Sequence, residues 1–212
     1  PFSPIDVIEE YTRPARFVEN GSLVVRPALS DPEMVWFDEV GTLESFNTDG
    51  LRTLIDTMSH IPNMKEKTLR YPGHRSLVLA LRESGFFSEE ALSIQSGPVK
   101  PIEFTSRVLF DAWRLGIDEP EFTVLRVTVR GVESGAPVVY TYNLYDEYDR
   151  ESGFSSMART TGFTATAMVE YLQDPGIDQP GVYPLEEIGR MVGGFGLTLR
   201  HLVERGVNLR GH

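Results

Sequence analysis

The chain has 212 residues, 41 % of them hydrophobic and 24 % charged, with a formal net charge of −11 and no cysteine. This composition is typical of a globular domain, and the acidic balance argues against a nucleic-acid partner, which requires clustered Lys and Arg. The lack of cysteine excludes thiol catalysis, disulfides and thiolate zinc sites and fits a cytoplasmic protein, and no apolar run approaches the roughly 20 residues of a membrane span.

The first half of the chain is predicted to contain short strands and two helices after an irregular opening rich in Pro and Glu. Apolar residues at helical spacing predict the first helix, with Thr48 or Asp49 as its cap, and Pro72-Gly73 marks the start of the second. The predicted strands cover residues 22–29, 33–40, 41–46 and 64–73. The predicted helices cover residues 47–60 and 74–83.

The second half is predicted to be a hairpin among helices. Two strands at 122–132 and 138–149, joined by a Glu-Ser-Gly-Ala-Pro turn, make this the clearest hairpin of the sequence, and the side chains of the first strand alternate well. The predicted helices cover residues 102–115, 153–174, 185–191 and 197–204. The helix over 153–174 is expected to be capped by Ser155 or Ser156 and to end at Pro175-Gly176. The order lacks regular βα alternation, so we expect one α+β domain, with a mixed β-sheet and helices packed on it.

Several familiar motifs are absent from the sequence. The glycines of "VGGFGLTLR" lack the third glycine of a dinucleotide-binding loop and follow a predicted helix, so we interpret them as an interhelix turn. No phosphate-binding P-loop and no G-x-S-x-G elbow occur. The four histidines have no metal-ligand spacing, so we expect neither a cofactor site nor a metal site in this chain.

Two polar segments lie where a strand meets a helix. In "SFNTDGL", Asn47, Thr48 and Asp49 either cap the helix, which the pattern favours, or face a ligand. In "TLRYPGH", Arg70 is either a surface cation or a planar fork suited to a carboxylate, next to Tyr71. The amides that open the following helix add a second anion-binding feature, and the residues alone leave both alternatives open.

A third segment, "SSMARTT", places Arg159 among small hydroxyl residues near a helix start. Close helix packing is the favoured explanation for these small residues.

Together, the segments "IEEYTRPARFVENG", "ESFNTDGLRTLIDT", "MKEKTLRYPGH" and "SSMARTTGFTATAMVEYL" resemble the saccharopine dehydrogenase family, especially its lysine 6-dehydrogenase-like branch. The resemblance covers roughly residues 7–172 in the same order. It implies a two-part enzyme, with a Rossmann domain for NAD or NADP and an α+β domain that binds the amino-acid substrate and carries the homodimer interface. This chain resembles the second part, and the cofactor site would lie outside it.

The resemblance also implies roles for particular residues. Arg70 matches the arginine expected to hold a substrate carboxylate, and Tyr71 and His74 would line the same region. The remaining substrate-binding candidates are Asn47, Thr48 and Asp49, which would face the cleft, and Arg159, which lies in a helix close to where the chain returns toward the nucleotide domain. Residues 175–212 would continue that return. No general acid or base is identified.

We therefore expect the substrate-binding and dimerisation domain of an NAD(P)-dependent dehydrogenase that acts on a C–N bond of lysine or a saccharopine-like amino acid. The alternative is a stand-alone ligand-binding or oligomerisation module without redox activity. The start at Pro1 fits a piece of a longer protein or a trimmed leader, and the sequence leaves both open. It does not distinguish NAD from NADP, or oxidation from reductive condensation.

Overall fold

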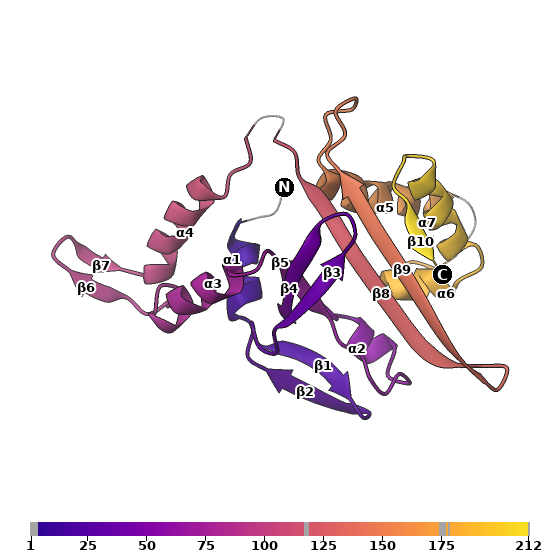
Figure 1. Cartoon of the computed structure of the whole chain (residues 1–212), viewed down its shortest axis with the longest axis horizontal. Coiled ribbons are helices and arrows are strands. Elements are labelled where there is room, and N and C mark those ends of the chain that lie inside the picture. Colours follow the sequence, from indigo (N-terminus) through magenta and orange to yellow (C-terminus); the bar gives the residue numbers. More distant parts are fainter. Residues whose placement is uncertain (1–3, 117–118, 174–176, 178, 212) are drawn as a thin grey trace. The chain divides into compact units, whose positions relative to one another are not determined.

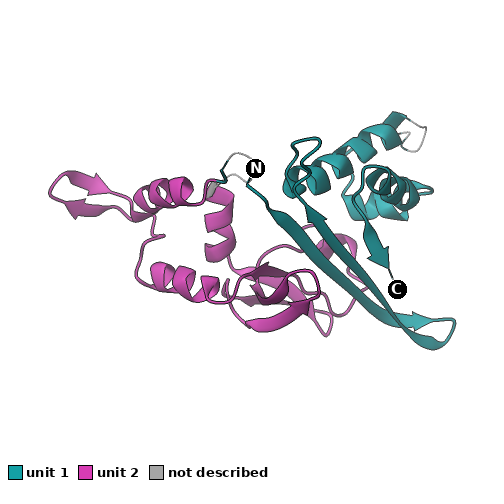
Figure 2. Cartoon of the chain, turned by 45° about the horizontal axis from the view of Figure 1, so that its top comes forward, with its two compact units in different colours: residues 1, 115–212 teal, residues 2–114 magenta. Residues whose placement is uncertain are grey.

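The computed structural model describes the chain except for residues 1–3, 117–118, 174–176, 178 and 212 (Figure 1). The described residues form two compact units, which we call the N-terminal unit, up to Arg114, and the C-terminal unit, from Leu115 (Figure 2). Whether the whole chain acts as one substrate-binding domain stays a prediction.

The N-terminal unit combines four helices with three small sheets. Its helices are α1 (Pro4–Thr12), α2 (Leu54–Thr57), α3 (His74–Glu83) and α4 (Pro101–Ala112). Its strands are β1 (Ala15–Glu19), β2 (Ser22–Arg26), β3 (Glu33–Phe37), β4 (Gly41–Asn47), β5 (Lys67–Arg70), β6 (Leu92–Ile94) and β7 (Gly97–Val99). The three-stranded sheet has the order β3-β4-β5, and β1-β2 and β6-β7 are separate hairpins.

The core of the N-terminal unit lies between α1, α3 and the central strand β4. Ile8 and Tyr11 of α1 are one helical turn apart, so both side chains point inward, where they join Phe46 of β4 and Val78 of α3. Tyr11 is 1 % exposed and Phe46 is fully buried. This packing fixes α1 next to the end of β4, which is where the candidate site forms.

The C-terminal unit is a long hairpin with helices on it. Its strands are β8 (Phe122–Glu133), β9 (Ala136–Glu147) and β10 (Leu209–Gly211), in the order β10-β9-β8. Its helices are α5 (Ser156–Gln173), α6 (Leu185–Arg190) and α7 (Gly194–Val203). At the hairpin tip, Ser134 and Gly135 have φ values of 51° and 83°, the left-handed pair that a two-residue turn of matching twist requires.

The predicted α+β class is confirmed, but the expected mixed sheet is corrected. All pairings of the described strands are antiparallel and fall into four separate sheets. Most neighbouring strands are joined by short turns, and a short turn permits only antiparallel pairing. Helix α1 and strand β1 replace the expected irregular opening, while β6, β7 and β10 were not predicted.

The predicted helix over 47–60 is wrong for most of its length. Only Leu54–Thr57 is helical, and Thr53, not Thr48 or Asp49, precedes it. By contrast, α3 and the long hairpin are confirmed, and Ser155 caps α5, since its Oγ accepts a hydrogen bond of 3.1 Å from the Ala158 amide. The predicted end of α5 at Pro175-Gly176 lies outside the described residues.

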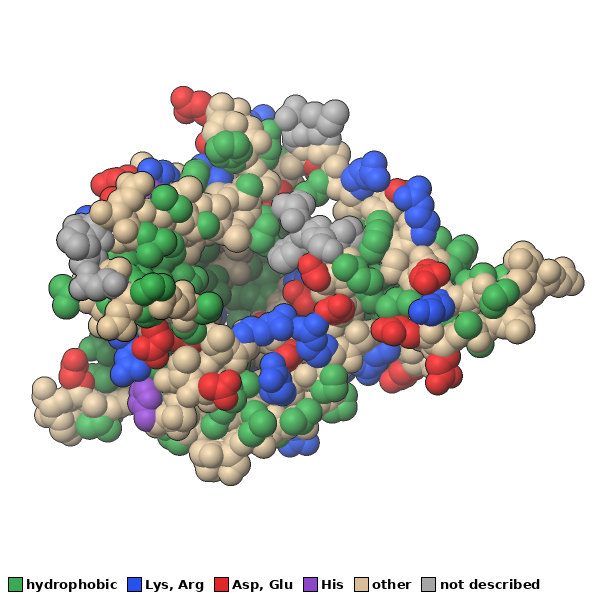
Figure 3. Space-filling view, turned by 180° about the vertical axis from the view of Figure 1, so that it is seen from behind, with side chains coloured by type: hydrophobic (Ala, Val, Ile, Leu, Met, Phe, Trp, Pro, Cys, Tyr) green, Lys and Arg blue, Asp and Glu red, His purple; other side chains and the backbone are tan. Residues whose placement is uncertain are grey.

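The described surface mixes charges of both signs. On the face shown in Figure 3, Lys and Arg side chains stand in small groups beside Asp and Glu. None of the described helices is long and apolar enough to cross a lipid bilayer.

Candidate functional site

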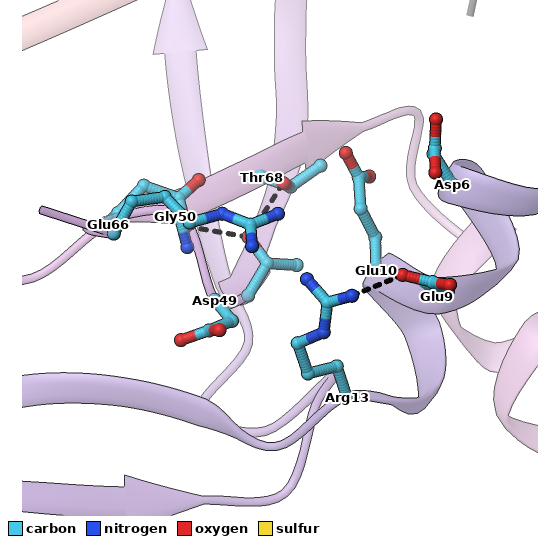
Figure 4. Close-up of a pocket in the computed structure, with 10 residues that line it drawn as sticks. Asp6, Glu9, Glu10, Arg13, Asp49, Gly50, Glu66 and Thr68 are labelled. Carbon is cyan, nitrogen blue, oxygen red and sulfur yellow. Dashed lines mark hydrogen bonds and ion pairs between the residues drawn. The ribbon is translucent and has the colours of Figure 1, made fainter. Parts of the chain in front are cut away.

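A cavity of about 270 Å³ lies in the N-terminal unit, between α1, the segment after β4 and the segment that leads into β5 (Figure 4). Five carboxylates and two guanidinium groups line it, which gives the wall a formal charge of −3. The lining residues are Asp6, Glu9, Glu10, Arg13, Thr48, Asp49, Gly50, Arg52, Glu66 and Thr68. Such a wall favours a ligand that carries a cationic group.

Glu66 is held in the cavity by neutral donors. Its Oε2 accepts hydrogen bonds from the Thr48 hydroxyl at 2.7 Å and from the Gly50 amide at 3.1 Å. The Thr48 hydroxyl also lies 2.8 Å from that of Thr68. A Cβ on Gly50 would lie 2.4 Å from the Glu66 carboxyl group, so only glycine permits this approach. Both of these donors to Glu66 are neutral groups, whereas Asp49 is bonded to a guanidinium.

Asp49 also lines the cavity, but its carboxylate is already paired. The Arg16 side chain donates two hydrogen bonds of 2.9 Å to it, one to each oxygen, and the Arg16 amide donates a third of 3.2 Å. These bonds hold the pKa of Asp49 below its usual range. Asp49 therefore joins the end of β4 to β1 and is less suited than Glu66 to take a ligand's cation.

Asn47 does not line the cavity. It is fully buried, and its Nδ2 donates to Ser30 Oγ at 3.0 Å and to Asp31 Oδ2 at 2.8 Å. These bonds hold the turn before β3 against the end of β4. In the structure Asn47 therefore stabilises this turn, while Thr48 and Asp49 line the cavity.

Arg70 lies behind the cavity wall and makes three hydrogen bonds. Its Nε donates to Tyr11 Oη at 3.2 Å, its Nη2 to Glu10 Oε2 at 3.1 Å, and its Nη1 to the Leu69 carbonyl at 2.8 Å. A guanidinium has five N–H groups, so two of them make no hydrogen bond to the described residues. Arg70 itself does not line the cavity, but it is hydrogen-bonded to Glu10, which does.

Glu10 differs from the other carboxyl groups of the cavity. Burial raises its pKa, while the nearby Arg70 guanidinium opposes this shift. A carboxyl group with a raised pKa in a cavity is suited to proton transfer. Glu10 was not predicted as a site residue because α1 was expected to be irregular, although the Pro4 start and the apolar spacing of that segment are helix signals.

His74 and Tyr71 follow Arg70 at the start of α3. His74 Nε2 lies 3.0 Å from Tyr11 Oη, and burial, reinforced by Arg70, lowers its pKa. Tyr71 is 59 % exposed. The expected anion-binding amides are already used, since the Gly73 amide donates to Glu44 Oε2 at 3.3 Å and the His74 amide donates to the Tyr71 carbonyl at 3.2 Å. Glu44 thus occupies the helix start that was predicted for a ligand.

Arg159 lies in the C-terminal unit and is surrounded by partners. It is 9 % exposed and donates from Nε and Nη2 to Asp146, from Nη1 to Asp149 at 3.2 Å, and from Nη2 to the Arg205 carbonyl at 3.2 Å. Through these bonds Arg159 joins α5 to the end of β9, which is a packing role. Its predicted part in a substrate site stays untested.

The glycine-rich segment does not fit a dinucleotide. It joins α6 to α7, so no strand precedes it, and a Cβ on Gly194 would lie 2.1 Å from the Ile188 carbonyl oxygen. Gly194 thus allows two helices to approach, and the prediction of an interhelix turn is confirmed. Within the described residues, no group of three or more His, Asp or Glu side chains could hold a metal ion.

The fold and the cavity define an α+β protein with small antiparallel sheets and an acidic site in its N-terminal unit. The chain belongs to the saccharopine dehydrogenase family: its residues 1–201 match the model described as the saccharopine dehydrogenase C-terminal domain. The family is one of oxidoreductases. The family prediction made from the sequence segments is confirmed.

Among solved structures, the chain is similar to apo histidine-tagged saccharopine dehydrogenase (L-Glu forming) from Saccharomyces cerevisiae, with a TM-score of 0.74 and 16 % sequence identity. The match covers 100 % of this chain and 61 % of that chain, so this chain spans about three-fifths of its length. At this identity the likeness concerns the fold.

Proposed function

We propose that this chain is the substrate-binding and dimerisation part of an NAD(P)-dependent dehydrogenase that acts on a C–N bond of lysine or a saccharopine-like amino acid. The observation that carries the proposal is the acidic cavity in a chain of this family, with the Glu66 carboxyl group held in its wall by neutral donors. A substrate with an amino group matches this wall, and its carboxylate would pair with a guanidinium.

Two arginines are available for that carboxylate. Arg70 is the residue expected from the family resemblance, and within the described part of the chain two of its N–H groups have no hydrogen-bond partner. Arg52 lines the cavity itself, is exposed, and adopts a φ of 50°, a conformation uncommon outside glycine. In the proposed arrangement Glu66 binds the substrate's ammonium group, and Glu10, with its raised pKa, handles the proton of the reacting amine.

The cofactor belongs to another part of the enzyme in this proposal. NAD or NADP would accept or supply the hydride, while the residues of this chain bind and orient the amino acid. The homodimer and the cytoplasmic location are parts of the same proposal, and they rest on the family resemblance and the cysteine-free composition.

The test uses the natural enzyme that contains this chain, assayed for NAD(P)-dependent turnover of L-lysine and of saccharopine. We expect Arg70→Lys to raise the KM by roughly tenfold or more, because a point charge cannot replace a planar fork. Arg52→Lys is the matched variant, and a larger effect there would move the carboxylate site into the cavity wall.

Calorimetry separates the proposal from its rival. If the protein binds an amino acid but shows no NAD(P)-dependent turnover, the stand-alone module is correct and the dehydrogenase proposal is overturned. A sedimentation run of the same enzyme tests the homodimer, and a monomer at high concentration would contradict that part.

A further inference from the structure

Tyr11 contacts Arg70 and His74, two of the residues that the sequence singled out, although Tyr11 itself was not among the predicted site residues. Its hydroxyl oxygen is 3.2 Å from Arg70 Nε and 3.0 Å from His74 Nε2. The ring is 1 % exposed and belongs to the core with Ile8 and Phe46, so the hydroxyl is held in place by packing.

The proton positions in this group follow from the hydrogen-bonding capacity of each atom. Arg70 Nε can only donate, so Tyr11 Oη accepts that bond. The Tyr11 proton then has two alternatives: it is donated to His74 Nε2, or His74 Nε2 carries its own proton and donates it to Tyr11. In the second case the Tyr11 proton would need another acceptor.

The described residues provide no other acceptor for the Tyr11 hydroxyl, which makes hydrogen bonds to Arg70 and His74 alone. A buried hydroxyl proton without an acceptor is strongly unfavourable. His74 Nε2 must therefore accept, and its single proton lies on Nδ1. Burial disfavours a charged His74 imidazole and the nearby Arg70 adds to this effect, while Glu44 opposes it.

We propose that Tyr11 is a positioning residue that fixes His74 as the neutral Nδ1–H tautomer and orients the Arg70 guanidinium toward Glu10. His74 then presents a hydrogen-bond donor, not a base, at Nδ1, an atom with no hydrogen bond to the described residues. In the proposed enzyme this donor suits a carboxylate or carbonyl oxygen of the amino acid. That last step rests on the proposed function, whereas the tautomer does not.

The direct test is a long-range ¹H–¹⁵N NMR spectrum of the 212-residue chain with labelled histidine, with the His74 signals assigned by His74→Gln. We expect the neutral Nδ1–H pattern at pH 7, and in Tyr11→Phe a His74 population that shifts toward Nε2–H. Tyr183→Phe is the control, since its hydroxyl donates to the Gln179 carbonyl at 3.0 Å in the C-terminal unit. A wild-type His74 that is Nε2–H or doubly protonated at pH 7 would overturn the proposal.

A second measurement covers the positioning role. In the natural enzyme, Tyr11→Phe should raise the KM about fivefold, the value of one lost hydrogen bond, with a smaller change in kcat. If Tyr11→Phe leaves the tautomer and the KM unchanged, Tyr11 is a core residue only. If the tautomer shifts but no amino acid is turned over, the proposed function fails and the Tyr11 assignment stands.

Discussion

The most direct prediction concerns Arg159, which the family resemblance placed in the substrate site and the structure surrounds with partners. In Arg159→Ala, Asp146 would keep its carboxylate at 5 % exposure without the guanidinium that now binds it through Nε and Nη2. Breaking a buried ion pair by removing one partner costs about 3–5 kcal/mol. The lost bonds to Asp149 and to the Arg205 carbonyl add to this cost.

The assay is urea unfolding of the 212-residue chain at neutral pH, followed by circular dichroism. We expect the free energy of unfolding to fall by about 3–5 kcal/mol, and Asp146→Ala combined with Arg159→Ala to recover part of the loss. Arg150→Ala is the control, because that exposed side chain makes no hydrogen bond or ion pair among the described residues. A loss below about 1 kcal/mol, the range of surface pairs, would refute the reasoning and return Arg159 to the list of candidate ligand residues.

Three further predictions test other parts of the structure. Gly194→Ala should lower the free energy of unfolding by about 1–3 kcal/mol because its Cβ would meet the Ile188 carbonyl, whereas Gly189→Ala, with open space around it, should not; urea titration compares them. Burial lowers the pKa of His74 in the folded state, so the stability that His74 contributes is present above its unfolded pKa of roughly 6.5 and is lost as the pH falls below that value. His74→Gln should therefore reduce the pH dependence of the free energy of unfolding between pH 7.5 and 5.5, measured by urea titration. Glu66→Gln should weaken L-lysine binding about tenfold by calorimetry, and unchanged affinity would remove Glu66 from the ammonium site.

Local signals in the sequence were sufficient where the structure depends on local chemistry. The Pro72-Gly73 pair predicted the start of α3 from the sequence. The structure shows why this signal was sufficient, since Gly73 adopts a φ of 94°, which other residues rarely do. The hairpin of β8 and β9 was predicted for the same reason, from a Ser-Gly turn between alternating strands. In both elements the determining residues are neighbours in the chain.

The segment 47–51 failed because its partners are distant. The apolar residues of the predicted helix over 47–60 have helical spacing, but Asn47, Thr48 and Asp49 at its start bond to residues 16 to 33 positions away, and these bonds replace helical capping. The segment 47–51 therefore has another local structure than predicted, whereas the start of α3 after Arg70 agrees with the prediction. Tyr11 and Glu66 escaped notice, since their importance comes only from contacts that folding creates.

The cavity has a consequence for how such a protein diversifies. All ten residues that line it lie between Asp6 and Thr68, and none comes from the C-terminal unit. If the proposed function holds, substitutions that alter the preferred amino acid can thus accumulate in one short stretch of the gene, separate from the residues that form α5, α6 and α7. A mutant library confined to codons 6–68 would sample the recognition chemistry, with Gly50 kept fixed because any side chain there displaces Glu66.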